Sequence, residues 1–307
     1  DYTIPDAPTA LNVSVYNLGA NTETNVEVEL FIKGTLATSE IVPSLTSGST
    51  HVLQYLWKPQ TEGTYNVTAY APSVLGEYDT TNNIVTTFIT VAKPLIHPVE
   101  GQWALYNLSV SGLQRNITFF MTWNFTYVKY ISPALVNVTL TSSQYQPGLN
   151  PTGWMILNIV TRQVEKDSGI YWAGMYYPAW IETNINVGSI IRLLMFNITV
   201  TGSQVIEAMG QKIDCWRFDM TVPGYYSNNY TFWYDKTSGV WTAMEIMASM
   251  NPPVKENLIL VTTNIPIGSA LKINTDKAMY VRNETATLQA TYKVGDTPIE
   301  NAQVLVE

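Results

Sequence analysis

Apolar and polar residues alternate in run after run along this chain, and that alternation limits the fold more than any other feature. The clearest run is residues 63–70, in which Tyr65, Val67 and Ala69 occupy every second position. A period of two places such residues on one face of a β-strand. Turn residues follow, and a second strand-like run covers residues 84–91. The pattern predicts a half-buried β-hairpin.

Further strand-like runs fill the first 93 residues. Turn signals such as Gly19 and Gly34 separate them at intervals of about 8–12 residues, which is the spacing of a β-sandwich. We therefore expect an all-β fold that begins with an Ig-like β-sandwich over residues 1–93.

Several spaced positions in this region resemble one known family. They are Asn17-Leu18-Gly19, the strand end Leu56–Pro59, Gly63-Thr64-Tyr65, and Glu77 with Asn82-Asn83. Together they are similar to a CARDB-type Ig-like domain. That family occurs in bacterial and archaeal surface proteins, often beside secreted proteases, so the resemblance implies an extracellular module.

The opening strand of such a domain is predicted to be short or missing here. Only residues 1–9 are available for it, and they include Pro5 and Pro8. Proline has no N–H group to donate to a neighbouring strand. One edge of the sandwich is therefore expected to lack a full strand.

A two-proline linker, residues 94–100, leads into a second β-rich domain at residues 101–268. Its longest strand-like run covers residues 117–127, and Ser238-Gly239 marks the tip of a hairpin. Long strands joined by hairpins predict an antiparallel meander, in the form of a curved sheet or half-barrel. The region resembles uncharacterised parts of archaeal surface proteins and lipoprotein-carrier half-barrels. Residues 161–182 are the best candidate for a helix or lid.

Residues 269–307 resemble the opening strands of a macroglobulin-type or bacterial Ig-like domain. The resemblance rests on residues 280–285 and 295–306, with Asn283 where the family has glycine. Asparagine tolerates a positive φ better than most residues that carry a side chain. The chain stops about halfway through such a domain, so this part is expected to be an incomplete sandwich.

Composition favours an extracellular or cell-surface location and argues against several functions. Charged residues make up 13% of the chain, against about 25% in a typical soluble domain. A surface of neutral polar groups fits a protein covered by glycans or by neighbouring subunits. The net charge of −8 argues against nucleic-acid binding, which needs basic patches. No apolar run reaches the roughly 18 residues that a membrane span needs.

Signals for asparagine-linked glycosylation are frequent. The pattern Asn-x-Ser/Thr occurs at nine positions: Asn12, Asn66, Asn107, Asn116, Asn124, Asn137, Asn197, Asn229 and Asn283. Asn124, Asn137 and Asn197 are each predicted to lie on the polar face of a strand. We expect N-glycans at several of the nine sites. The alternative is that asparagine and threonine only fill exposed strand positions.

Residues suited to catalysis are few. The two histidines, His51 and His97, lie in different parts of the chain, and no nucleophile-elbow, metalloprotease or phosphate-loop motif is present. The single cysteine, Cys215, has no histidine nearby in sequence, which favours a buried structural thiol. We therefore predict a non-enzymatic protein without catalytic residues.

Two groups of side chains are candidates for binding. One is an aromatic cluster, interpreted either as a platform for sugars or a lipid or as core packing or a subunit contact: Trp172, Tyr176, Tyr177 and Trp180. The other is a calcium site in one loop, although the ligand spacing is not diagnostic: Glu77, Asp79, Asn82 and Asn83. No other cofactor is expected.

Together these features favour an architectural role outside the cell, as a surface-layer, stalk or filament subunit or an adhesin. Because the first domain is expected to lack its opening strand, a strand from one copy could complete the sandwich of another and produce a polymer. The subunit contact would be made by apolar positions of the last run: Ile299, Ala302, Val304 and Val306. Two alternatives stay open: a lipid- or glycan-binding module, and the accessory region of a secreted protease.

Overall fold

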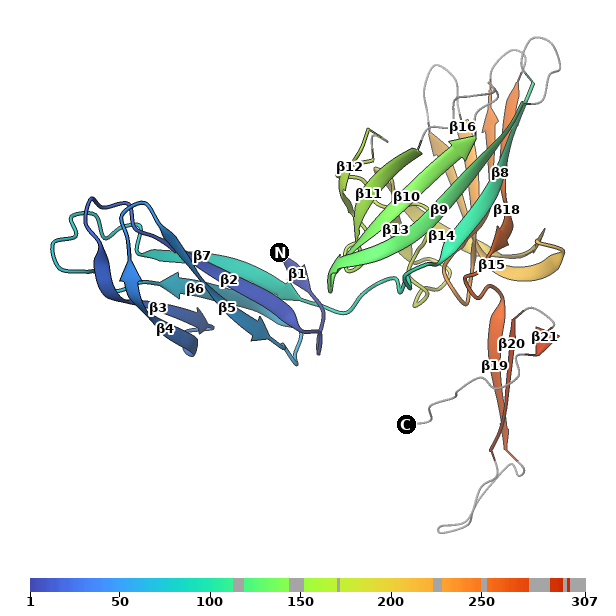
Figure 1. Ribbon diagram of the computed structural model, residues 1–307. Coiled ribbons are helices and arrows are strands. Elements are labelled where there is room, and N and C mark those ends of the chain that lie inside the picture. The colour runs from blue at the N-terminus through green and yellow to red at the C-terminus, as the bar shows by residue number, and fades with distance from the viewer. Residues whose placement is uncertain are drawn as a thin grey trace. The chain divides into compact units, whose positions relative to one another are not determined.

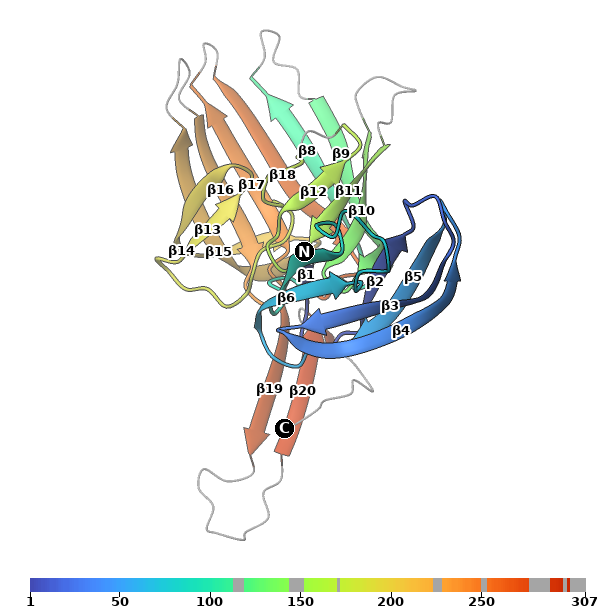
Figure 2. The same cartoon turned by 90° about the vertical axis from the view of Figure 1, so that its left-hand side faces the viewer.

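The regular elements of this protein are β-strands throughout the residues that the structure describes. The computed structural model describes residues 1–112, 119–143, 152–169, 172–222, 228–249, 253–275, 288–294 and 297–298. The predicted all-β class is confirmed. The chain divides into two compact units, one made chiefly of residues 1–94 and the other chiefly of residues 95–307 (Figures 1 and 2). No helix in the described ranges is long and apolar enough to span a membrane.

The first unit is an Ig-like β-sandwich of two sheets, as predicted. One sheet has the strand order β1-β7-β6-β3-β4, and β2 pairs with β5 in the other. The strands are β1 (Tyr2–Thr3), β2 (Thr9–Tyr16), β3 (Glu23–Ile32), β4 (Thr35–Leu45), β5 (Thr50–Trp57), β6 (Gly63–Tyr70) and β7 (Ile84–Val91). Alternate residues such as Val28, Leu30 and Val67 are buried between the sheets.

The first strand lies at the edge of the larger sheet. β1 has only two residues and pairs in parallel with the end of β7, Tyr2 opposite Thr90 and Thr3 opposite Val91. β7 pairs along its whole length with β6 on the other side. Within the described residues, the outer edge of β7 before Phe88 therefore has no strand beside it.

The second unit is built on one curved sheet (Figures 1 and 2). Its strand order is β12-β11-β10-β9-β8-β18-β17-β16-β15-β14-β13, and the run from β9 to β13 is antiparallel. The sheet does not close into a barrel, because β12 and β13 are its two edges. Its strands are β8 (Trp103–Ser111), β9 (Phe119–Ser132), β10 (Leu135–Ser143), β11 (Thr152–Asn158), β12 (Val164–Asp167), β13 (Ile190–Leu193), β14 (Phe196–Ala208), β15 (Gln211–Val222), β16 (Asn228–Asp235), β17 (Trp241–Ala248) and β18 (Val254–Thr263).

A segment without regular structure links the two edge strands and fills part of the core. Tyr176 forms isolated bridges with Gln163 and with Leu194, and Trp180 forms one with Val240. Residues 161–182 were the expected helix or lid, but the described part has no helix. Gly174 has a positive φ, and Pro178 lacks an N–H group, so the sequence there suits an extended path better than a helix.

One buried cation holds this segment in place. Arg162 is 2% exposed, and its Nε lies 2.8 Å from Oε2 of Glu182. The other guanidinium nitrogens donate to backbone oxygens of residues 177, 180 and 192. One guanidinium therefore joins the turn before β12, the linking segment and β13. A lone arginine in the sequence gave no sign of this role.

The end of the chain adds three short strands. β19 (Ser269–Thr275), β20 (Leu288–Val294) and β21 (Thr297–Pro298) form an antiparallel sheet. The predicted subunit-contact residues lie outside the described residues: Ile299, Ala302, Val304 and Val306.

Candidate functional site

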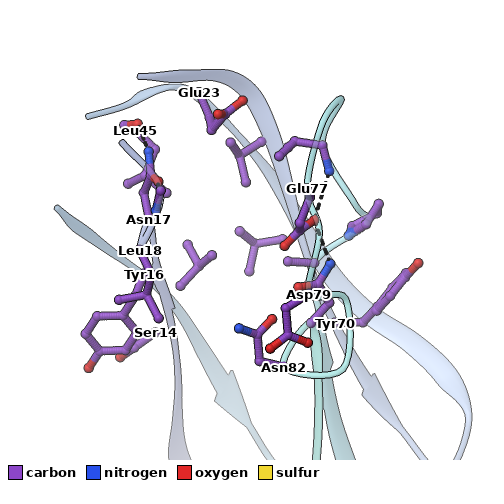
Figure 3. Close-up of a pocket in the computed structure, with 18 of the residues that line it drawn as sticks. Ser14, Tyr16, Asn17, Leu18, Glu23, Leu45, Tyr70, Glu77, Asp79 and Asn82 are labelled. Atoms are coloured by element: carbon purple, nitrogen blue, oxygen red, sulfur yellow. Dashed lines mark hydrogen bonds between the residues drawn. The ribbon is translucent and has the colours of Figure 1, made fainter. Parts of the chain in front are cut away.

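A crevice opens at one end of the first sandwich. One side is formed by the end of β2 and the turn that follows it. The other side is the 71–83 loop, which joins β6 to β7 (Figure 3). The volume of the crevice is about 620 Å³. The floor is apolar and includes Val13, Val15 and Val28. These residues belong to the alternating core pattern, and Val13 and Val15 are half-buried.

The first wall is fixed by the side chain of Asn17. Its Nδ2 donates to the backbone oxygens of Asn21 at 2.9 Å and Leu45 at 2.7 Å, and its Oδ1 accepts from Gly19 N at 2.9 Å. Asn17 is almost fully buried, so these bonds replace the water that an amide loses on folding. In the Asn17-Leu18-Gly19 motif, the Asn17 side chain thus stabilises the turn.

The second wall is fixed by two carboxylates of the 71–83 loop. Glu77 Oε2 accepts from Val74 N at 3.1 Å and from Asn83 Nδ2 at 3.0 Å (Figure 3). Asp79 Oδ1 accepts from both the hydroxyl and the N–H of Thr81. Those hydrogen bonds favour the charged carboxylate and lower the pKa of Asp79. Asp79 therefore stays ionised at neutral pH, and both acids shape the loop through their hydrogen bonds.

The chemistry of the crevice is that of a binding surface. Glu23, Glu77 and Asp79 line it, and no lysine, arginine, histidine or cysteine is among its lining residues. The lining therefore offers carboxylates and apolar side chains to a ligand.

The residues predicted to bind calcium all lie in the 71–83 loop or at its end: Glu77, Asp79, Asn82 and Asn83. Glu77 and Asp79 each use one oxygen to accept two N–H or O–H groups of the same loop. Nowhere in the described parts of the chain do three or more histidine, cysteine, aspartate or glutamate side chains gather as a metal site. Calcium binding here stays a prediction.

The outer edge of β7 is a second candidate site, because among the described residues β1 pairs only with the last two residues of this strand, Thr90 and Val91. Thr90 N donates to Asp1 O at 2.9 Å, and Phe88 O accepts from the Asp1 amino terminus at 3.3 Å. Peptide groups of alternate residues point to the same edge of a strand. The N–H and C=O groups of Ile84 and Thr86 therefore point outward as well.

Apolar side chains accompany this unpaired edge. Ile84, Val85 and Phe88 are 57%, 66% and 61% exposed. An exposed edge strand with apolar side chains is a template on which a further strand can pair. The incomplete edge expected from Pro5 and Pro8 stays a prediction, because β1 precedes both prolines.

The glycosylation signals lie on strands of both units. Five asparagines are exposed: Asn12, Asn66, Asn107, Asn197 and Asn229. Asn124 and Asn137, expected on a solvent face, are only half-exposed, and the Oδ1 atom of each is buried. Asn116 and Asn283 lie outside the described residues.

The aromatic cluster belongs largely to the core of the second unit. Tyr177 is fully buried and Trp180 is 5% exposed, so neither offers a ring face to a ligand. Their rings pack edge-on against Phe125 and Tyr127. Trp172 and Tyr176 are half-buried, and Trp172 stacks on Phe125. Core packing, the alternative interpretation, describes this cluster better than a ligand platform.

Cys215 is a fully buried thiol, as predicted, and burial raises its pKa to about 12. We expect no reaction with a thiol-specific disulfide reagent at pH 8 in the native protein, and full reaction after unfolding in urea. The thiol pKa is higher in the folded protein than in the unfolded one, so the thiol stabilises the folded state at any pH below its ordinary pKa of about 9. That contribution is lost as the pH rises from there toward 12. Rapid native labelling at pH 8 would contradict the burial of this thiol.

With this geometry in place, comparison with known proteins decides the nature of the first unit. The CARDB family model matches residues 3–87. Residues 3–87 form a CARDB domain. CARDB domains are non-catalytic, Ig-like and found in surface-associated or extracellular proteins. No curated protein matches the chain.

Solved structures with similarity to the chain include two of one CARDB domain. The crystal structure of the CARDB domain of the PF1109 protein from Pyrococcus furiosus, in complex with di-metal ions, is 29% identical. The match covers 30% of this chain and 80% of that one, with a TM-score of 0.29. The solution structure of the same CARDB domain is 28% identical over 30% of this chain and 85% of that one, with a TM-score of 0.28. A DUF1329 family protein from Desulfovibrio piger is 10% identical over 55% of this chain and 87% of that one, with a TM-score of 0.21.

Proposed function

We propose that this protein is a non-enzymatic extracellular glycoprotein with a structural role, as a surface-layer, stalk or filament subunit or an adhesin. Its copies join by strand addition at the CARDB domain. The observation that carries this proposal is the unpaired outer edge of β7, where Ile84 and Thr86 direct their peptide groups away from the sheet.

The added strand would come from a second copy. Backbone hydrogen bonds to β7 would supply affinity, and the exposed side chains of Ile84 and Phe88 would pack against those of the added strand. We propose the segment that includes Val304 and Val306 as the donor, because the sequence alternates apolar and polar residues there. Donor and acceptor are then two different segments of one chain. A head-to-tail contact of this kind propagates into a polymer unless the rotation closes a ring.

Imaging the purified full-length protein by negative-stain electron microscopy tests this proposal. We expect filaments or sheets. Sedimentation velocity should show that their mass grows with protein concentration. A strictly monomeric protein at all concentrations would contradict the proposed assembly.

N-glycans are the second part of the proposed function. We expect intact-peptide mass spectrometry of the native protein to find glycans at several of the exposed sites: Asn12, Asn66, Asn107, Asn197 and Asn229. Occupancy should be much lower at the half-exposed Asn124 and Asn137, because a transferase must reach the amide nitrogen. If the asparagines at all five exposed sites carry no glycan, the proposal that this protein is a glycoprotein is wrong.

The alternative of a lipid- or glycan-binding second unit gains no support from the described residues. Such a module needs a hollow on its concave side. The described side chains of this unit form one packed core, in which Phe125, Tyr177 and Trp180 fill the space beside the sheet. We therefore place the binding function on the CARDB domain.

A further inference from the structure

We propose that the crevice of the CARDB domain, with the apolar residues at its mouth, is a docking site for an extended protein segment that carries basic and apolar side chains. This inference concerns a surface other than the backbone edge of β7 and does not rest on the proposed polymer. Three properties of the crevice lead to it: its size, its charge and the exposure of its rim.

The size of the crevice suits a bound segment. A volume of about 620 Å³ falls within the range of about 300–1,000 Å³ that is typical of ligand sites. The valine floor can receive apolar side chains, and burial of each would contribute roughly in proportion to the area removed from water. The crevice lies between two walls and can therefore take a chain that runs along it (Figure 3).

The charge of the crevice is one-sided. Glu23, Glu77 and Asp79 supply three carboxylates, and no basic side chain lines the crevice to neutralise them. Figure 3 shows Glu77 and Asp79 on the side opposite Asn17 and Leu18, with Glu23 between the two sides. A lysine or arginine beside an apolar side chain would complement this arrangement, whereas an acidic ligand would be repelled.

The rim is more apolar than a small-molecule site requires. Leu75 and Tyr78 are 103% and 104% exposed, and Leu18, on the opposite wall, is 82% exposed. These side chains contact almost nothing in their own chain. Aromatic and aliphatic anchors around a pocket are typical of protein–protein interfaces. They extend the surface beyond the crevice, which is why a protein segment fits better than a small ligand.

The chemistry favours a different protein over a second copy of this chain. With a net charge of −8 and only 16 lysine and arginine residues among 307, the chain itself is a poor source of a basic segment. Association of two copies at an acidic crevice would bring like charges together. The partner is therefore a segment of a basic protein.

The test uses the full chain and a short fluorescein-labelled peptide that alternates lysine with valine and tyrosine. Fluorescence anisotropy should show saturable binding that weakens as salt rises. Glu23→Gln should weaken binding about two- to fivefold. Leu75→Ser and Tyr78→Ser should each weaken it by at least about fivefold, as expected for anchor residues. The matched control is Glu27→Gln, which removes one exposed carboxylate of β3 outside the crevice.

The result that supports the proposal is loss of affinity in the three crevice variants and none in Glu27→Gln. All four substitutions are at positions that are exposed or half-exposed, so thermal unfolding should match the unmodified protein and confirm that the variants fold. Equal binding by all variants would show non-specific attraction and overturn the proposal. So would equal affinity for a peptide with glutamate in place of lysine, or no saturable binding by the lysine peptide.

Discussion

Replacing Thr86 with proline is expected to abolish assembly of the full-length protein while the CARDB domain stays folded. The N–H of Thr86 points away from β6, because Phe88 and Thr90 direct their peptide groups to the same outer edge. Proline at that position removes one donor from the edge and places its ring where an added strand would lie. Proline is tolerated on an edge strand when its N–H side faces solvent.

The matched control is Thr86→Ala. Thr86 Oγ1 on β7 lies 2.8 Å from Thr68 Oγ1 on the neighbouring strand β6. Both substitutions remove that contact. Only proline removes the outward N–H. We therefore expect polymers from Thr86→Ala and monomers from Thr86→Pro, measured by sedimentation velocity and electron microscopy. If Thr86→Pro assembles as well as the alanine variant, the strand is not added at β7.

The second large effect is expected at Arg162. Replacing it with methionine keeps much of the side chain but leaves the buried Oε2 atom of the half-buried Glu182 without its cation. It also removes the donors to three backbone oxygens. Removal of one partner from a buried ion pair costs about 3–5 kcal/mol. The φ of Arg162 is +61°, which methionine adopts no more easily than arginine does, so the backbone is not relieved by the change.

Urea unfolding followed by tryptophan fluorescence measures this loss. All tryptophans except Trp57 follow residue 94, so the signal reports mainly on the second unit. The control is Arg217→Met, since Arg217 pairs with Asp219 on an exposed strand surface. An exposed pair contributes about 0–1 kcal/mol. Similar losses in the two variants would show that Arg162 does not hold the linking segment.

The sequence predicted those parts of the fold that depend on local pattern. Alternation of apolar residues around Val28 and Val67 predicts strands, since a period of two places one set in the core. The CARDB resemblance rests on residues such as Asn17 and Glu77, and the structure shows both holding the turns in which they lie.

Features that depend on distant residues could not be predicted in this way. Arg162 is bound by Glu182 and by backbone oxygens as far along the chain as residue 192, and no local pattern encodes that pairing. Tyr177 and Trp180 are core residues only because Phe125 and Tyr127 lie beside them in the folded sheet. The crevice is lined by Val13 and Val15, which in sequence look like any other core residues of a sandwich.

The central claim is that a strand from another copy pairs with β7 of the CARDB domain. The most direct test is a cryo-electron microscopy reconstruction of the assembled native protein, in which the chain beside residues 84–88 is traced. The account predicts a strand of a neighbouring copy there, bonded to the outward peptide groups of Ile84 and Thr86. An edge that is bare in the assembly, or covered by residues of its own chain, would contradict it.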